Sequence, residues 1–173
     1  MGTETIVLSV LAPDHPGLTA SEQPSLYWHI STATTYPVEL TIMDPRQVEP
    51  LLETRLPSPT AAGLHRVKLA DLGVRLDPDV PYRWYVSVVL DPDRRAKDVL
   101  AGGVIERVSV SSDLRQRVAQ ASKEQLPAIY AADGLWYDAL TTASDLVEAN
   151  PANQTLRRER AALLSQVGLP VRD

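Results

Sequence analysis

The 173-residue chain contains no cysteine and no phenylalanine. The absence of cysteine excludes disulfide bonds, thiolate metal sites and a cysteine nucleophile, although it does not identify a cellular compartment. The absence of phenylalanine leaves three tryptophans and six tyrosines as the large aromatic residues. Bulky packing in the interior is therefore assigned to Trp28 and Trp84, because each side chain can bury on the order of 200 Å².

The chain also lacks a basic excess and long apolar runs. Its 17 Lys and Arg against 22 Asp and Glu give a formal net charge of −5. Nucleic acids and anionic membranes are bound through basic stripes, so no nucleic-acid partner is predicted. No apolar run approaches the ~20 residues of a membrane span. The start, MGTETIVLSVLAP, lacks the regions of a secretion signal, so the localisation is open between the cytosol and an exported form that has lost its leader.

The first 111 residues have the pattern of a β-sandwich. Short runs rich in Val, Ile, Thr, Tyr and Trp alternate with clusters of Pro, Asp and Gly. Seven is the strand count of immunoglobulin and fibronectin type III domains, so residues 1–111 are predicted to form such a sandwich. The seven predicted strands are residues 4–11, 25–31, 38–43, 51–56, 64–69, 82–90 and 104–110.

Side chains that alternate along three of these strands predict the core, because residues two apart share a face of a strand. The predicted core residues are Leu26, Trp28, Ile30, Val38, Leu40, Ile42, Tyr82, Trp84, Val86, Val88 and Leu90.

From Ser112 onward the apolar period becomes helical, and residues 112–173 are predicted to form a small helical subdomain packed on one sheet. The first helix, SDLRQRVAQASKEQ, is predicted to begin at an N-cap Ser112, and the second lies in LWYDALTTASDLVEAN. A third helix is predicted after Asn150 and Pro151, as N-cap and first helical residue. Its predicted apolar stripe consists of Leu156, Leu163, Leu164 and Val167, and its predicted end is at Gly168 and Pro170.

Two Asp-Pro-Asp triplets, beginning at Asp77 and Asp91, are predicted to be turns. The spacing from Leu76 to Tyr82 is typical of a tyrosine corner, in which the Tyr hydroxyl bonds a backbone group a few residues upstream. The triplets lie at opposite ends of a strand about 25–30 Å long, so they cannot share one calcium ion.

No other motif points to catalysis, a metal or a cofactor. None of His15, His29 and His65 has the spacing of a metal site or of a catalytic triad. Gly102-Gly103 is too short for a phosphate loop, so a bulge or turn is predicted there.

The outward side chains of the strand at residues 82–90, which include Tyr85 and Val89, are too apolar to face water. The helix of Trp136 is therefore predicted to cover them and Ile105, on the outer face of the sheet formed by the third, sixth and seventh strands. The junction between sandwich and helices, called the seam here, is the predicted binding site. The candidate binding residues at the seam are Arg83, Tyr85, Glu106, Arg107, Trp136 and Asp138.

Five segments together resemble the bacterial domain-of-unknown-function family 928, known mostly from cyanobacteria. They are LAPDHPGLT, EQPSLYW, YRWYVSVVLDPDRR, GGVIERV and GLWYDALTT, in that order. The resemblance implies export, because members usually carry a secretion signal before the LAP segment. It attaches no activity and no residue role.

The prediction for function is a noncatalytic interaction or binding module, envelope-associated, with another protein as partner. Two alternatives stay open. One is a hydrolase with its polar site at the seam, and the other is a carbohydrate-binding module in which exposed Tyr27 and His29 stack on a sugar.

Overall fold

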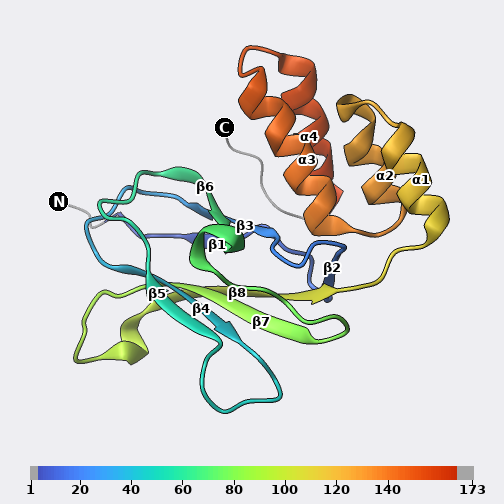
Figure 1. The fold of residues 1–173 in the computed structure, drawn as a ribbon. Coiled ribbons are helices and arrows are strands. Elements are labelled where there is room, and N and C mark those ends of the chain that lie inside the picture. Colours follow the sequence, from blue (N-terminus) through green and yellow to red (C-terminus); the bar gives the residue numbers. More distant parts are fainter. Residues whose placement is uncertain (1–3, 167–173) are drawn as a thin grey trace.

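The computed structural model describes residues 4–166, which form eight strands in two sheets followed by four α-helices (Figure 1). The three-stranded sheet has the order β1–β3–β6 and is antiparallel. The five-stranded sheet has the order β2–β8–β7–β4–β5, antiparallel except that β2 runs parallel to β8. The strands are β1 (Leu8–Val10), β2 (Gly17–Thr19), β3 (Ser25–Ile30), β4 (Val38–Met43), β5 (Leu52–Arg55), β6 (Gly63–Lys68), β7 (Pro81–Val88) and β8 (Val99–Arg107).

All seven predicted strands are present, but the prediction missed β2 and the first half of β8. Gly102 and Gly103 lie inside β8, so the predicted bulge or turn is wrong. Each glycine lies opposite a large ring of β7: Tyr85 pairs with Gly102 and Trp84 with Gly103. A Cβ atom at Gly102 would lie 2.5 Å from Cδ1 of Tyr85. These glycines therefore make room for aromatic rings and do not end the strand.

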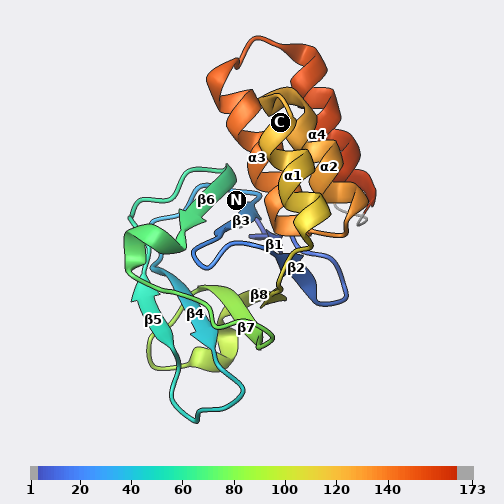
Figure 2. The ribbon, with the colours of Figure 1, turned by 45° about the vertical axis from the view of Figure 1, so that its right-hand side comes forward.

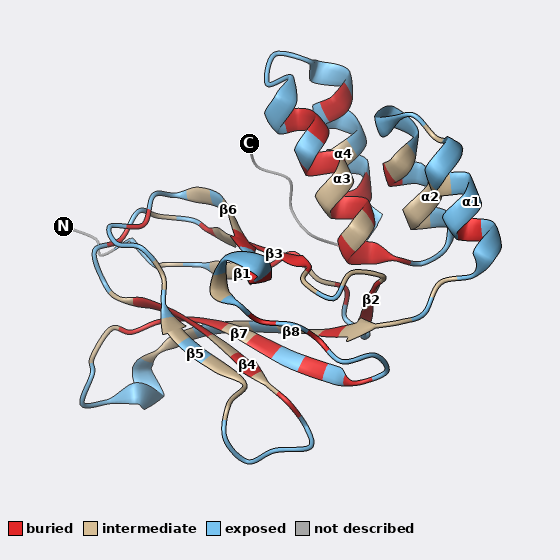
Figure 3. Cartoon of the chain, in the orientation of Figure 1, coloured by how far each residue is buried: buried red, intermediate tan, exposed pale blue. Residues whose placement is uncertain are grey.

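The predicted core is confirmed at every position except Leu90, which is half-buried. β7 alternates between buried and more exposed residues over its first half, as Figure 3 shows. The predicted position of Ile105 on the outer face is wrong, because Ile105 pairs with the inward-facing Tyr82 and is 1% exposed. Trp28 stacks on His65 across β3 and β6, with ring centroids 4.4 Å apart.

The tyrosine corner is present. The Tyr82 hydroxyl accepts a hydrogen bond from the backbone N–H of Asp77 at 2.9 Å. Arg46 lies against the same hydroxyl at 3.4 Å and forms ion pairs with Asp44 and Asp77 at 2.7 and 2.8 Å. The first Asp-Pro-Asp triplet thus belongs to the loop that fixes the start of β7.

The helices are α1 (Ser112–Gln120), α2 (Leu126–Ala132), α3 (Trp136–Ala149) and α4 (Gln154–Gln166). The predicted first helix ends early, and α2 was not predicted. The N-cap of α1 is Ser111, whose hydroxyl accepts from the N–H of Leu114. α4 begins after Asn153, whose side chain accepts from two N–H groups, and not after Asn150. The predicted stripe and end residues Val167, Gly168 and Pro170 lie outside the described residues.

The helices lie on the side of the three-stranded sheet (Figures 1 and 2). α3 contacts β2 and β3, and Arg66 of β6 reaches Asp145 of α3 at 2.6 Å. The prediction that the Trp136 helix covers the outer face of β4, β7 and β8 is therefore wrong. It covers Tyr27 of β3, which is 1% exposed, so the predicted sugar platform of Tyr27 and His29 is also wrong.

Candidate functional site

The central residue of the seam is Tyr137, which the list of candidate residues omitted. It lies in the first turn of α3 and reaches the interior of the sandwich. Its hydroxyl accepts a hydrogen bond from Nε1 of Trp84 at 3.0 Å and donates one to the carbonyl of Val104 at 3.0 Å. Burial raises the pKa of Tyr137 above its usual range, so the hydroxyl keeps its proton and can donate.

Room for the Tyr137 ring comes from a glycine in β2. A Cβ atom at Gly17 would lie 2.5 Å from Cε2 of Tyr137. The segment before β2 makes a second contact with the same helix, because Nε1 of Trp136 donates to the carbonyl of Leu11 at 3.0 Å. Two neighbouring aromatic residues therefore fix the start of α3 to the N-terminal part of the sandwich.

Asp138 completes the seam. Its carboxylate accepts hydrogen bonds from the backbone N–H of Ala20 at 2.8 Å and from the Thr19 hydroxyl at 3.2 Å. Burial raises the pKa of Asp138 to about 6, against the lowering effect of those two donors. The hydrolase hypothesis places its polar site at the seam. The Asp138 carboxylate at the seam is hydrogen-bonded to Thr19 of β2 and to the backbone of the loop that follows β2.

The structure brings Trp136 and Asp138 together at the seam and places Arg107 next to it, paired with Thr19, whose hydroxyl donates to Asp138. The other three candidates lie elsewhere. Arg107 donates to the carbonyl of Leu76 at 3.0 Å, beside the tyrosine corner. Arg83, Tyr85 and Glu106 follow the opposite alternation from the buried residues of β7 and β8, so they point out from the sandwich. The six residues therefore do not form one site.

The three outward candidates lie on an open surface that we call the Tyr85 face. It consists of the outward side chains of Thr41, Met43, Arg83, Tyr85, Leu100, Val104 and Glu106, on β4, β7 and β8. Tyr85 lies against Gly102 and is half-buried, and Leu100 is 58% exposed. At one end of the face, Glu39 is paired with Arg95 at 2.7 Å and with Arg55 at 3.9 Å.

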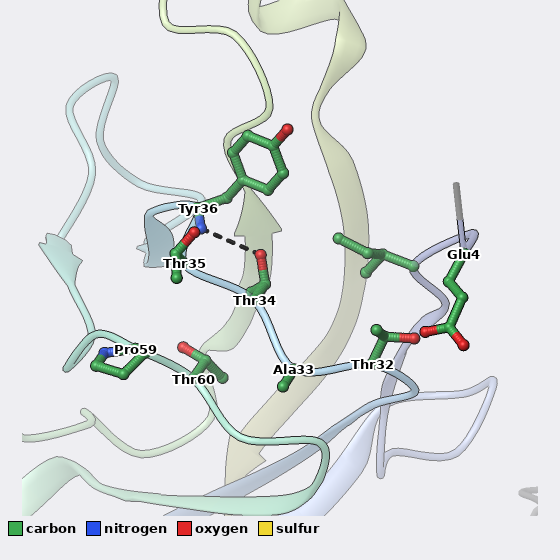
Figure 4. A pocket seen from close by; sticks show the side chains of 9 residues that line it. Glu4, Thr32, Ala33, Thr34, Thr35, Tyr36, Pro59 and Thr60 are labelled. Atoms are coloured by element: carbon green, nitrogen blue, oxygen red, sulfur yellow. Dashed lines mark hydrogen bonds between the residues drawn. The ribbon is translucent and has the colours of Figure 1, made fainter. Parts of the chain in front are cut away.

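A cleft of about 360 Å³ lies at the loop end of the sandwich, and we call it the loop-end cleft (Figure 4). Sequence reasoning missed it, although its signal is a run of hydroxyl side chains, STATTY, between β3 and β4. The lining residues are Glu4, Ile6, Thr32, Ala33, Thr34, Thr35, Tyr36, Pro59 and Thr60.

The family model described as Domain of Unknown Function (DUF928) matches residues 2–171 of the chain. The chain belongs to the DUF928 family. This confirms the resemblance inferred from the five segments. No curated protein matches this DUF928 chain.

Two further properties of the DUF928 chain bear on its chemistry. Between residues 4 and 166, no group of three or more His, Asp or Glu side chains is placed to hold a metal ion. In the same range, no helix is long and apolar enough to cross a membrane.

Proposed function

We propose that this DUF928 protein is a noncatalytic binding module, that its partner is another protein, and that the Tyr85 face is the contact surface. The observation that carries the proposal is the composition of that face. Tyr85, Leu100 and Val104 form an apolar centre, and charged side chains such as Arg83 and Glu106 surround it. Protein interfaces combine an aromatic or apolar centre with a polar rim in this way.

The layers of the molecule support the choice of this face. The outer face of the three-stranded sheet is occupied by α3 at Tyr27. The helices described between residues 4 and 166 lie on that side of the sandwich, away from β7, the strand that carries Tyr85 (Figure 1). Tyr85 and Leu100 thus stay available to a partner.

We also propose that the sandwich is of the immunoglobulin type and that the protein is located in the cell envelope. Strand order supports the fold assignment: β1, β3 and β6 match strands A, B and E, and β4, β7 and β8 match strands C, F and G. In this assignment the first strand is divided between the sheets, with β2 as its second half beside β8. The envelope location rests on the export that family resemblance implies.

Site-specific crosslinking tests the proposal. A photoreactive benzoylphenylalanine replaces Tyr85, or Glu124 as the control at an exposed helical position, in protein expressed in its native cells. We expect one discrete protein adduct from position 85 that position 124 does not give. The captured protein is identified by mass spectrometry and then purified. It should bind the wild type, and its affinity for the Tyr85→Ala variant should be at least about tenfold lower.

Two outcomes would argue against this function. One is equal adducts from both positions. The other is a captured protein whose purified form binds the wild type and the Tyr85→Ala variant with equal affinity.

A further inference from the structure

We propose that the loop-end cleft is a binding site for a neutral saccharide, independent of the Tyr85 face. The cleft lies between three segments that are far apart in the sequence: the residues before β1, the β3–β4 connection and the β5–β6 connection. Its volume of about 360 Å³ is within the range of roughly 300–1,000 Å³ found for small-molecule sites.

The base of the cleft is held by backbone hydrogen bonds. Thr34 and Thr60 exchange two N–H···O bonds, each 2.9 Å long, which join the β3–β4 and β5–β6 connections. The Thr34 hydroxyl accepts from the N–H of Tyr36 at 3.1 Å, as Figure 4 shows. A base fixed in this way is preorganised, so a ligand does not have to order the loops on binding.

The side chains of the cleft combine an aromatic ring, hydroxyl groups and one carboxylate. Tyr36 is 47% exposed. In Figure 4, Tyr36 and Pro59 lie toward one end and Glu4 and Thr32 toward the other. The hydroxyls of Thr34 and Thr60 are engaged internally. The side chains of Glu4 and Thr35 make no hydrogen bond to other residues in the range 4–166, so they are open to a ligand.

This combination matches the chemistry of a pyranose. A sugar ring has an apolar C–H face, which packs on an aromatic side chain, and hydroxyl groups at its edge. A carboxylate accepts from two neighbouring hydroxyls through charge-assisted hydrogen bonds. In an oligosaccharide, Tyr36 would take the C–H face of one ring and Thr35 its hydroxyls, while Glu4, at the other end of the cleft (Figure 4), would take hydroxyls of a neighbouring ring.

The charge of the cleft selects a neutral ligand. Among the lining residues that the structure describes, Glu4 is the one charged residue, and it is negative. Phosphates and acidic sugars would meet a carboxylate with no compensating Arg, Lys or His among these residues, and a divalent cation would find a single carboxylate there.

The test is an NMR titration of the isotope-labelled chain with neutral oligosaccharides: maltohexaose, cellohexaose, mannohexaose and hexa-N-acetylchitohexaose. We expect at least one to shift the amide signals of residues 32–36 and 60, with a Kd of roughly 1 mM or tighter. Tyr36→Ala should weaken that binding by at least about fivefold, and Glu4→Gln by about threefold or more. Matched controls at exposed positions outside the cleft lining, Val48→Ala and Glu124→Gln, should leave the Kd unchanged.

Three results would overturn the assignment. The first is no shift at the cleft with any of the four oligosaccharides up to about 10 mM, which is tenfold above the expected Kd. The second is cleft binding of an acidic oligogalacturonide or of a Thr- and Pro-rich peptide in preference to the neutral probes. The third is sugar binding that Tyr85→Ala abolishes and Tyr36→Ala does not affect.

Discussion

Three neighbouring residues at the start of α3, Trp136, Tyr137 and Asp138, join the two parts of the protein. Each makes a polar contact with a different part of the sandwich: the carbonyl of Leu11, the indole of Trp84, and the β2 region. Sequence periodicity marks Trp136 as a packing residue. It cannot identify Tyr137, because its partners are more than 30 residues away in the chain.

The hydroxyl of Tyr137 is expected to contribute measurably to stability. Tyr137→Phe keeps the ring but leaves the buried N–H of Trp84 and the carbonyl of Val104 without that partner, which should lower the free energy of unfolding by about 1–3 kcal/mol. Tyr27→Phe is the matched control in the same interface. Its hydroxyl is buried near Thr141 and Ser144 without a hydrogen bond of standard geometry. Urea unfolding should give a smaller loss for Tyr27→Phe, and equal losses would contradict the assigned role of Tyr137.

Asp138 is expected to make stability depend on pH. Its pKa is raised from 3.8 to about 6 in the folded chain, so between these values the folded state holds a proton that the unfolded state has lost. Stability therefore falls as pH rises through this window and is constant above it. At neutral pH the ionised carboxylate costs roughly 2–3 kcal/mol relative to its protonated form.

The isosteric Asp138→Asn variant removes this titration. Urea unfolding between pH 4.5 and 7.5 should show the wild type losing stability relative to Asp138→Asn as pH rises, by about 1–3 kcal/mol. The exposed control Asp71→Asn should show no such trend relative to the wild type. A wild-type-to-Asn difference that is constant across the range would show that Asp138 ionises normally.

At the scale of elements, the sequence predicts the strands in which apolar and polar side chains alternate. It misses the strands that form only through pairing with residues far away in the chain. β3, β4 and β7 alternate clearly and were located with their core residues. β2 has three residues in a segment rich in proline and glycine, and its parallel pairing with β8 leaves no local pattern. The glycines of β8 resemble a break because the rings that require them, Tyr85 and Trp84, are on another strand.

The position of the helices was mispredicted for a related reason. Outward Tyr85 suggested a surface that needs a cover, but Gly102 lets the ring lie flat on the sheet. The candidate site was therefore split: Trp136 and Asp138 are at the seam, and Arg83, Tyr85 and Glu106 are on the Tyr85 face. The loop-end cleft depends on three segments meeting, so the run STATTY shows one side of it in the sequence but not the cleft itself.

β2 is expected to tolerate no side chain at Gly17. In Gly17→Ala the new methyl group would lie 2.5 Å from the Tyr137 ring, and that ring is held by hydrogen bonds to Trp84 and Val104. Overpacking of this kind costs about 1–3 kcal/mol. In a Tyr137→Ala background the clash disappears, so Gly17→Ala should cost much less there. Additive losses in this double-mutant cycle would show that Gly17 and Tyr137 are not coupled.

At the scale of the whole molecule, the question is whether residues 1–111 fold without the helices, as the predicted division into two domains implies. Tyr27 is covered by α3, and Tyr137 fills space beside Trp84 between the sheets. Exposing Tyr27 alone would remove up to roughly 1.5–3 kcal/mol, the value for fully burying one large side chain. That is a large share of the stability of a domain at the lower end of the roughly 5–15 kcal/mol range.

A chain ending at residue 111 is therefore expected to be unstable: it should bind a hydrophobic dye and unfold without a cooperative transition. The fragment 112–173, added in trans, should restore cooperative melting and suppress the dye signal. The same fragment carrying Tyr137→Ala should do so poorly, since it no longer fills the space beside Trp84. If residues 1–111 alone melt cooperatively within a few degrees of the full chain and bind no dye, the helices are an independent appendage. The contacts of Trp136, Tyr137 and Asp138 would then contribute little to the stability of the sandwich.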